Sequence, residues 1–132
     1  MFGIEKLIGP GFITKLKGIY SGEMATYLEW ILERYGFDTK ICISRRNGTD
    51  KVSHAWTAVD IGTRRYFIDP VARNDGGFIF NIIKPENGNY ELYARYDRIY
   101  NDIYELSKSE NLSEFDWWNI PVLRLKLEEK GE

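Results

Sequence analysis

Residues 53–69 read SHAWTAVDIGTRRYFID and carry the clearest signal for a β-sheet in the chain. Two runs rich in β-branched and aromatic residues, 53–61 and 64–69, flank the dipeptide Gly62-Thr63. Runs of this kind joined by a short glycine turn are typical of an antiparallel β-hairpin. Pro70 follows the second run, and it is expected to end that strand because proline cannot donate to a sheet ladder.

A helix is predicted upstream of this hairpin, over residues 21–35. Ser21 suits the N-cap, Glu23 suits the first turn and Gly36 suits the C-terminal cap. Apolar residues recur at helical spacing between them, namely Met24, Leu28, Ile31, Leu32 and Tyr35. This face is expected to pack on the sheet.

The rest of the chain adds further short elements. Strands are predicted over 39–44, 78–83 and 120–127, a second helix over 96–106, turns at Asn47-Gly48, 74–77 and 85–89, and a short helix or irregular arm over 1–20. Helices and strands are segregated rather than alternating, which favours an α+β fold with an antiparallel sheet. The length fits a single domain, residues 1–132.

The composition excludes several classes of function. The chain of 132 residues has 18 Lys and Arg against 20 Asp and Glu, and this balance argues against nucleic-acid binding. One cysteine and one histidine exclude intrachain disulfides, zinc fingers and multi-histidine metal centres. No apolar stretch is long enough to span a bilayer, and residues 1–19 lack the apolar core of a signal peptide. We expect a cytoplasmic protein without membrane contact, or a domain of a longer exported chain.

Three polar residues fall where acyl-transfer chemistry needs them. The point halfway between His54 and Asp69 lies at the hairpin turn, so the two are expected to face each other across the ladder. Asp69 would then hold one ring nitrogen of His54, and the other would face Ser21 at the start of the helix. Unpaired N–H groups at a helix N-terminus stabilise negative charge, so a nucleophile and an oxyanion are both favoured there.

The same residues carry a resemblance to a family. Ser21-Gly22-Glu23-Met24-Ala25-Thr26-Tyr27-Leu28, then Gly36-Phe37, then His54-Ala55-Trp56 and Ile68-Asp69-Pro70 resemble the transglutaminase-like superfamily, above all archaeal members. The likeness covers residues 20–70, and Asp116-Trp117-Trp118 is similar to a feature of archaeal relatives. The resemblance implies a papain-like α+β fold and a cysteine peptidase, amidase or transglutaminase that needs no metal and no cofactor.

The resemblance also implies roles for single residues. His54 would be the general base, Asp69 its orienting partner, and Ser21 would stand where the family has its nucleophilic cysteine. Tyr20 and Trp56 would line the binding site of a peptide or protein substrate. The backbone N–H of residue 21 would be one oxyanion donor. Hydrolysis is favoured over transamidation because no separate site for an acceptor amine is visible in the sequence.

The serine at position 21 is the departure from the family pattern. A thiol ionises near neutral pH beside a histidine, whereas a hydroxyl does not, so activity is expected to fall by orders of magnitude. Three explanations stay open: an engineered Cys-to-Ser change, a natural inactive variant that binds a peptide or protein partner through the same cleft, and a true serine enzyme. Cys42 lies on the following strand and is predicted to be a small buried hydrophobe.

Aromatic residues are dense downstream of the hairpin. They are Tyr90, Tyr93, Tyr96, Tyr100, Tyr104, Trp117 and Trp118. Such a set either packs over the helix predicted at 96–106 or lines a groove for an extended peptide or a glycan.

Overall fold

The computed structural model describes residues 21–45, 48–49, 52–72, 75, 78–110 and 120–132. The arm predicted over 1–20, including Tyr20, lies outside the described residues. So do Asn47 of one predicted turn and the segment Asp116-Trp117-Trp118.

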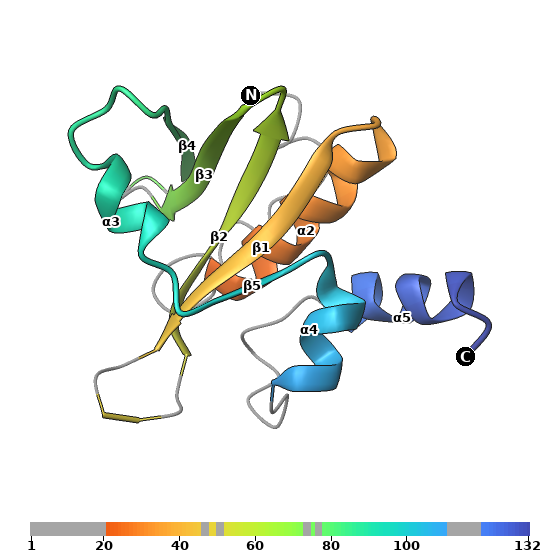
Figure 1. Ribbon diagram of the computed structural model, residues 1–132. Helices are drawn as coiled ribbons and strands as arrows, with labels where there is room; N and C mark the ends of the chain where they lie inside the picture. The colour runs from red at the N-terminus through yellow and green to blue at the C-terminus, as the bar shows by residue number, and fades with distance from the viewer. Residues whose placement is uncertain (1–20, 46–47, 50–51, 73–74, 76–77, 111–119) are drawn as a thin grey trace.

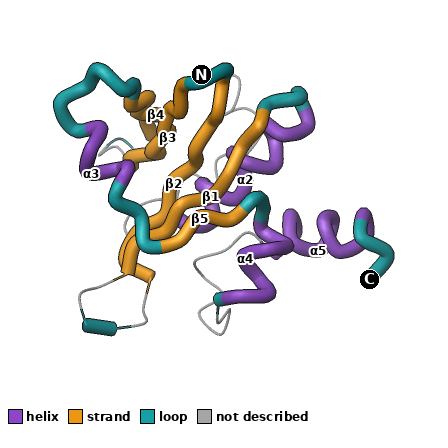
Figure 2. The backbone as a smooth tube through the Cα atoms, viewed as in Figure 1, coloured by secondary structure: helices purple, strands orange, loops and turns teal. Residues whose placement is uncertain are grey.

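One antiparallel sheet forms the centre of the fold, with strand order β4-β3-β2-β1-β5 (Figure 1). Its strands are β1 (Asp38–Arg45), β2 (Val52–Ile61), β3 (Arg64–Ala72), β4 (Phe78–Ile83) and β5 (Arg98–Tyr100). Helix α2 (Ser21–Arg34) packs against β1, β2 and β3, and α4 (Ile103–Ser109) and α5 (Ile120–Glu129) pack together beside β5. The predicted α+β class, a helix packed on an antiparallel sheet, is confirmed (Figure 2).

The predicted hairpin forms through a two-residue turn. Ile61 pairs with Arg64, and Gly62 and Thr63 connect them. Gly62 has a φ of 62°, a conformation that glycine adopts without steric cost, while Thr63 keeps a negative φ. Glycine at the first turn position is typical of the type II′ turn, whose twist matches that of the flanking strands.

The pairing of β2 with β3 differs from the predicted register. The paired residues run from the turn to Thr57 and Ile68. One more step in this register sets Asp69 across from Trp56, so Asp69 and His54 are diagonal rather than direct partners. The sequence placed the turn at Gly62-Thr63 correctly, but direct pairing of His54 with Asp69 would need a register two residues away from the one observed.

Pro70 was expected to end β3, and this was wrong. The strand continues to Ala72, and Pro70 pairs with Phe80 of β4. The register of the hairpin would set Pro70 across from Ala55, where proline has no N–H to give. Pro70 therefore limits the pairing of β3 with β2 but not the strand itself.

Helix α2 ends as the sequence predicts. Gly36 has a φ of 91°, and its N–H donates to the carbonyl oxygen of Glu33 at 3.0 Å. The N–H of Phe37 reaches back to the carbonyl oxygen of Leu32 at 3.1 Å. These two bonds form a Schellman motif, which satisfies carbonyl groups left free at the helix end.

Apolar side chains cover both faces of the sheet. The cluster on the α2 side comprises Ala25, Ile41, Ile43, Ala55, Tyr100, Ile103, Leu106 and Val122. The opposite cluster comprises Cys42, Trp56, Ala58, Phe67 and Ile83, against which Tyr90, Tyr93 and Ala94 of α3 (Tyr90–Ala94) pack. Alternate residues of β1 and β2 supply the two clusters, as the two-residue period of a strand requires.

The helix predicted over 96–106 was wrong in its first half. Residues 98–100 form β5, which pairs with β1, and α4 begins only at Ile103. Asp102 caps this helix by accepting a hydrogen bond from the N–H of Glu105 at 2.9 Å. The cap sets the start of the helix, whereas the tyrosine spacing upstream of it imitates a helical period.

The strand predicted over 120–127 was also wrong, because these residues belong to α5. Pro121 suits the first turn of a helix, where its missing N–H has no partner to lose. Val122 and Lys126, four residues apart, are both buried, which is the spacing of one helix face. The alternation of apolar and charged residues in this segment therefore does not mark a strand.

Candidate functional site

The structure brings His54 and Asp69 together. Nε2 of His54 lies 2.9 Å from Oδ1 of Asp69. The imidazole is 38% exposed and the carboxylate 6%, so the ring is open to solvent on one side while its partner is buried. A carboxylate only accepts, so Nε2 donates this bond and Nδ1 is left as an acceptor. A diagonal pair on one sheet face is close enough for this contact.

Tyr93 of α3 holds the second oxygen of this carboxylate. Its hydroxyl donates to Oδ2 of Asp69 at 2.6 Å. Burial, followed by this hydrogen bond to Asp69, raises the pKa of Tyr93 above the ordinary value for a phenol. The phenol therefore keeps its proton and donates, and both oxygens of Asp69 are engaged. The density of tyrosines is visible in the sequence, but no local spacing links Tyr93 to Asp69.

Ser21 lies beside the backbone that carries His54. Its Oγ accepts a hydrogen bond from the N–H of Ala55 at 3.3 Å. The pairing of β2 with β3 runs from the turn only to Thr57 and Ile68, so the N–H of Ala55 lies beyond the paired residues of the hairpin. Ser21 was expected to cap the helix, whereas α2 begins at Ser21 itself. Among the contacts of the described residues, none joins Ser21 directly to the His54 ring.

Trp56 forms the inner wall of the site. Its ring centroid lies 5.6 Å from that of His54 and 5.5 Å, edge-on, from that of Tyr93. Trp56 is 4% exposed, and its indole N–H is buried without a hydrogen-bond partner in the described part of the chain. A buried donor without an acceptor is costly, so this group needs an explanation.

Cys42 is buried in the core next to this wall. It is inaccessible to solvent, and burial raises the pKa of its thiol to about 12. A thiol that holds its proton so firmly is a poor nucleophile. Cys42 is thus the small buried hydrophobe that the sequence predicts.

A pocket opens where His54 faces α3. It has a volume of about 270 Å³ and is lined by Ser44, His54, Trp56, Leu92, Tyr93 and Arg95. Strand β1 contributes Ser44, which is the cross-strand partner of His54. The exposed side of the imidazole therefore borders a cavity large enough for an amino-acid side chain.

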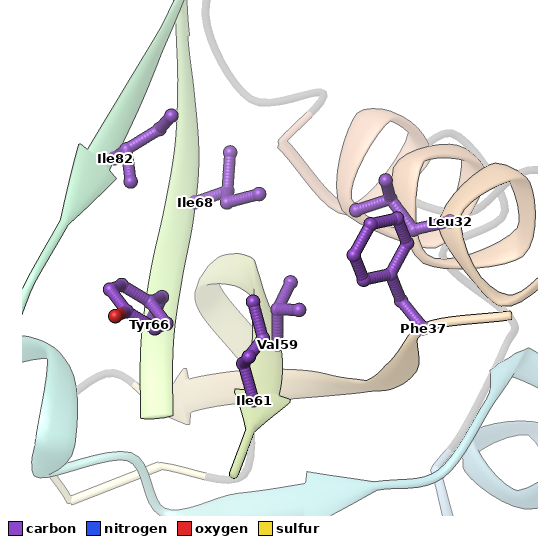
Figure 3. Close-up of a pocket in the computed structure, with 7 residues that line it drawn as sticks. All are labelled: Leu32, Phe37, Val59, Ile61, Tyr66, Ile68 and Ile82. Carbon is purple, nitrogen blue, oxygen red and sulfur yellow. The ribbon is translucent and has the colours of Figure 1, made fainter. Parts of the chain in front are cut away.

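A second pocket contains no group suited to chemistry. Seven side chains line it, Leu32, Phe37, Val59, Ile61, Tyr66, Ile68 and Ile82, between the end of α2 and the sheet (Figure 3). Val59 and Ile61 point to the face opposite His54, because odd and even positions of β2 face opposite ways. This cavity is separate from the candidate site.

Neither a cluster of metal-ligating side chains nor a membrane-spanning helix is found in the part of the chain that the structure describes. Within the described ranges, no group of three or more His, Cys, Asp or Glu side chains is placed to hold a metal ion. No helix in those ranges is long and apolar enough to cross a membrane. Comparisons with protein-family models, curated proteins and solved structures find no match for this chain.

Proposed function

We propose that residue 21, His54 and Asp69 form an acyl-transfer site for amide bonds, of the transglutaminase-like peptidase or amidase type. The observation that carries this proposal is the contact of Nε2 of His54 with Asp69, with the oxygen of residue 21 bound to the next backbone N–H, that of Ala55. Three separate elements, α2, β2 and β3, supply these groups. A peptide or protein is the proposed substrate, and hydrolysis is the proposed outcome.

In the proposed reaction each residue of the site has its own role. As the nucleophile of residue 21 attacks the amide carbonyl carbon, Nδ1 of His54 takes its proton and the carbonyl electron pair moves onto oxygen. The N–H of residue 21, at the start of α2, supports the oxyanion. Collapse breaks the C–N bond, and His54 gives its proton to the leaving amine. Water then attacks the acyl-enzyme by the same route and releases the acid.

The serine makes this site slow. A cysteine at the same position would exist as a thiolate beside an imidazolium, whereas a serine must lose its proton during the attack. The described contacts include no bond from Ser21 to the imidazole that would assist this transfer. We therefore propose activity for the cysteine form and little turnover for the serine form.

A second candidate function is binding without reaction. The serine at position 21 favours it, because no contact among the described residues joins its hydroxyl to the His54 ring, which would have to take its proton. In that case a peptide or protein partner would use the same cleft, and the histidine would serve in recognition only.

The reactivity of Ser21→Cys separates the two functions. The proposed site lowers the pKa of this thiol by roughly three units, which raises the thiolate fraction at pH 6 but reduces the nucleophilicity of each thiolate. The net result should be labelling by iodoacetamide at pH 6 that is roughly tenfold faster than for an ordinary exposed thiol. Ser109→Cys, at the exposed C-terminal end of α4, is the matched control. Adding His54→Gln to Ser21→Cys should remove the advantage. Equal labelling of the two cysteines would favour the binding function.

A further inference from the structure

The pocket beside His54 lies against the proposed reaction site. The imidazole forms part of its wall, and Tyr93, which holds Asp69, forms another part. A side chain that enters this pocket therefore belongs to a residue close to the reacting amide. The remaining walls decide which side chain fits.

Arg95 brings to this pocket a positive charge that no described residue pairs with. It is the residue that follows α3, it is exposed, and no ion-pair or hydrogen-bond partner is found for it within the described residues. Three other arginines of the fold are held by carboxylates, namely Arg45 by Glu110, Arg64 by Glu86 and Arg65 by Asp60. Arg98 and Arg124 share with Arg95 the absence of an ion pair among the described residues, but they do not line this pocket. Arg95 is thus free to bind an anion from outside the chain, and its planar guanidinium matches a carboxylate.

Most of the other walls are apolar or aromatic. Trp56 and Tyr93 present ring surfaces, and Leu92 is 68% exposed at the rim. The indole N–H of Trp56 is itself buried and has no acceptor among the described residues, so Trp56 contributes its ring rather than its N–H to the pocket wall. The hydroxyl of Ser44 is engaged with Ser53 at 3.1 Å. These walls fit a short aliphatic stem that ends in an acceptor group.

We propose that this pocket binds an acidic side chain of a peptide substrate, with Arg95 as the partner of its carboxylate. This inference rests on the proposed function, because it places the acidic residue next to the amide that reacts at residue 21. A carboxylate at the C-terminus of a peptide has the same chemistry, so the two sources need separate probes.

The test measures peptide binding to the protein with Ser21 in place, which allows binding without turnover. The probes are a capped pentapeptide with a central glutamate, the same peptide with glutamine, and the glutamine peptide with a free C-terminal carboxylate. NMR titration follows the indole N–H signal of Trp56, assigned from Trp56→Phe. The glutamate peptide should bind roughly tenfold more tightly than its capped glutamine counterpart.

Arginine variants test the assigned partner. Arg95→Gln should abolish the preference for glutamate, whereas Arg124→Gln, which removes an exposed charge from α5, should retain it. Equal binding of the capped glutamate and glutamine peptides, or a preference that survives Arg95→Gln, would overturn the inference. A preference only for the free C-terminus would reassign the pocket from side chains to chain ends, and would also overturn it.

A failure of the proposed acyl-transfer function can be distinguished from a failure of the proposed acidic-peptide binding. Thiol reactivity at residue 21 depends on His54 and not on Arg95. Fast labelling of Ser21→Cys combined with no preference for acidic peptides would leave the acyl-transfer site intact and remove only the acidic substrate. Ordinary labelling combined with an Arg95-dependent preference would leave a binding cleft for acidic peptides without catalysis.

Discussion

Glu29 makes the stability of this fold depend on pH. The side chain is 1% exposed, and its Oε2 accepts a hydrogen bond from the hydroxyl of Thr39 at 2.6 Å, while its Oε1 has no hydrogen-bond partner in the described part of the chain. Burial, against the smaller opposing effect of Thr39, raises the pKa of Glu29 to about 8 from a value of 4.5. Nearby Glu33 and Asp102 add to the increase, and Lys126 reduces it.

The sign follows from proton binding. Between the two pKa values the folded protein holds a proton on Glu29 that the unfolded chain has released. The free energy of unfolding therefore falls as the pH rises through this window. Between pH 5 and pH 7.5 the contribution of this one group is about 3 kcal/mol. Glu29→Gln keeps the shape and the hydrogen bond to Thr39 but cannot ionise, so it should remove that contribution.

The assay is urea unfolding of both proteins at pH 5 and pH 7.5. The variant should be nearly as stable as the parent at pH 5 and more stable at pH 7.5, by roughly 2–3 kcal/mol. Glu128→Gln, at an exposed position of α5, is the control and should follow the parent at both pH values. Parallel pH dependence in the parent and in Glu29→Gln would show that folding does not raise the pKa of Glu29.

Two further predictions concern the candidate site and the C-terminal end of α2. Tyr93→Phe removes the donor to Oδ2 of Asp69, so Ser21→Cys/Tyr93→Phe should label at least a few-fold more slowly than Ser21→Cys at pH 6; labelling at an unchanged rate would show that the phenol does not position Asp69. Gly36→Ala places a side chain on a residue with a φ of 91°, which should cost about 1 kcal/mol of stability in urea unfolding. No atom lies within 4 Å of the new Cβ, so this cost comes from the backbone conformation and not from a clash. Gly88→Ala, which has neither a positive φ nor a contact, should cost less; the opposite order would contradict the backbone argument.

The centre of the fold could be predicted because local signals agree there. Gly62 marks the turn between two β-rich runs, and the apolar residues of α2 keep helical spacing as far as Gly36. The structure then brings His54 and Asp69 within hydrogen-bond distance even though their register is diagonal. Side chains that are diagonal neighbours on one sheet face can still touch, so the predicted contact forms although the predicted register is two residues off.

The rest of the chain depends on tertiary contacts. In α5, Lys126 is buried because its ammonium lies 2.9 Å from Glu33 of α2, and an alternating sequence cannot reveal a partner so distant. Tyr93 reaches Asp69 across 24 positions of sequence, and Arg95 enters the same pocket through the end of α3. These residues could be recognised only after the sheet had placed α3 over His54.

NMR of the His54 ring shows directly whether residue 21 faces the imidazole. His54 is the single histidine of the chain, so its ring proton signal needs no further assignment. We compare the protein with Ser21 and the Ser21→Cys variant. If residue 21 faces Nδ1, the thiolate stabilises the imidazolium, and the titration of His54 moves to higher pH by about one unit or more. Superimposable titration curves for the two proteins would contradict the proposed site.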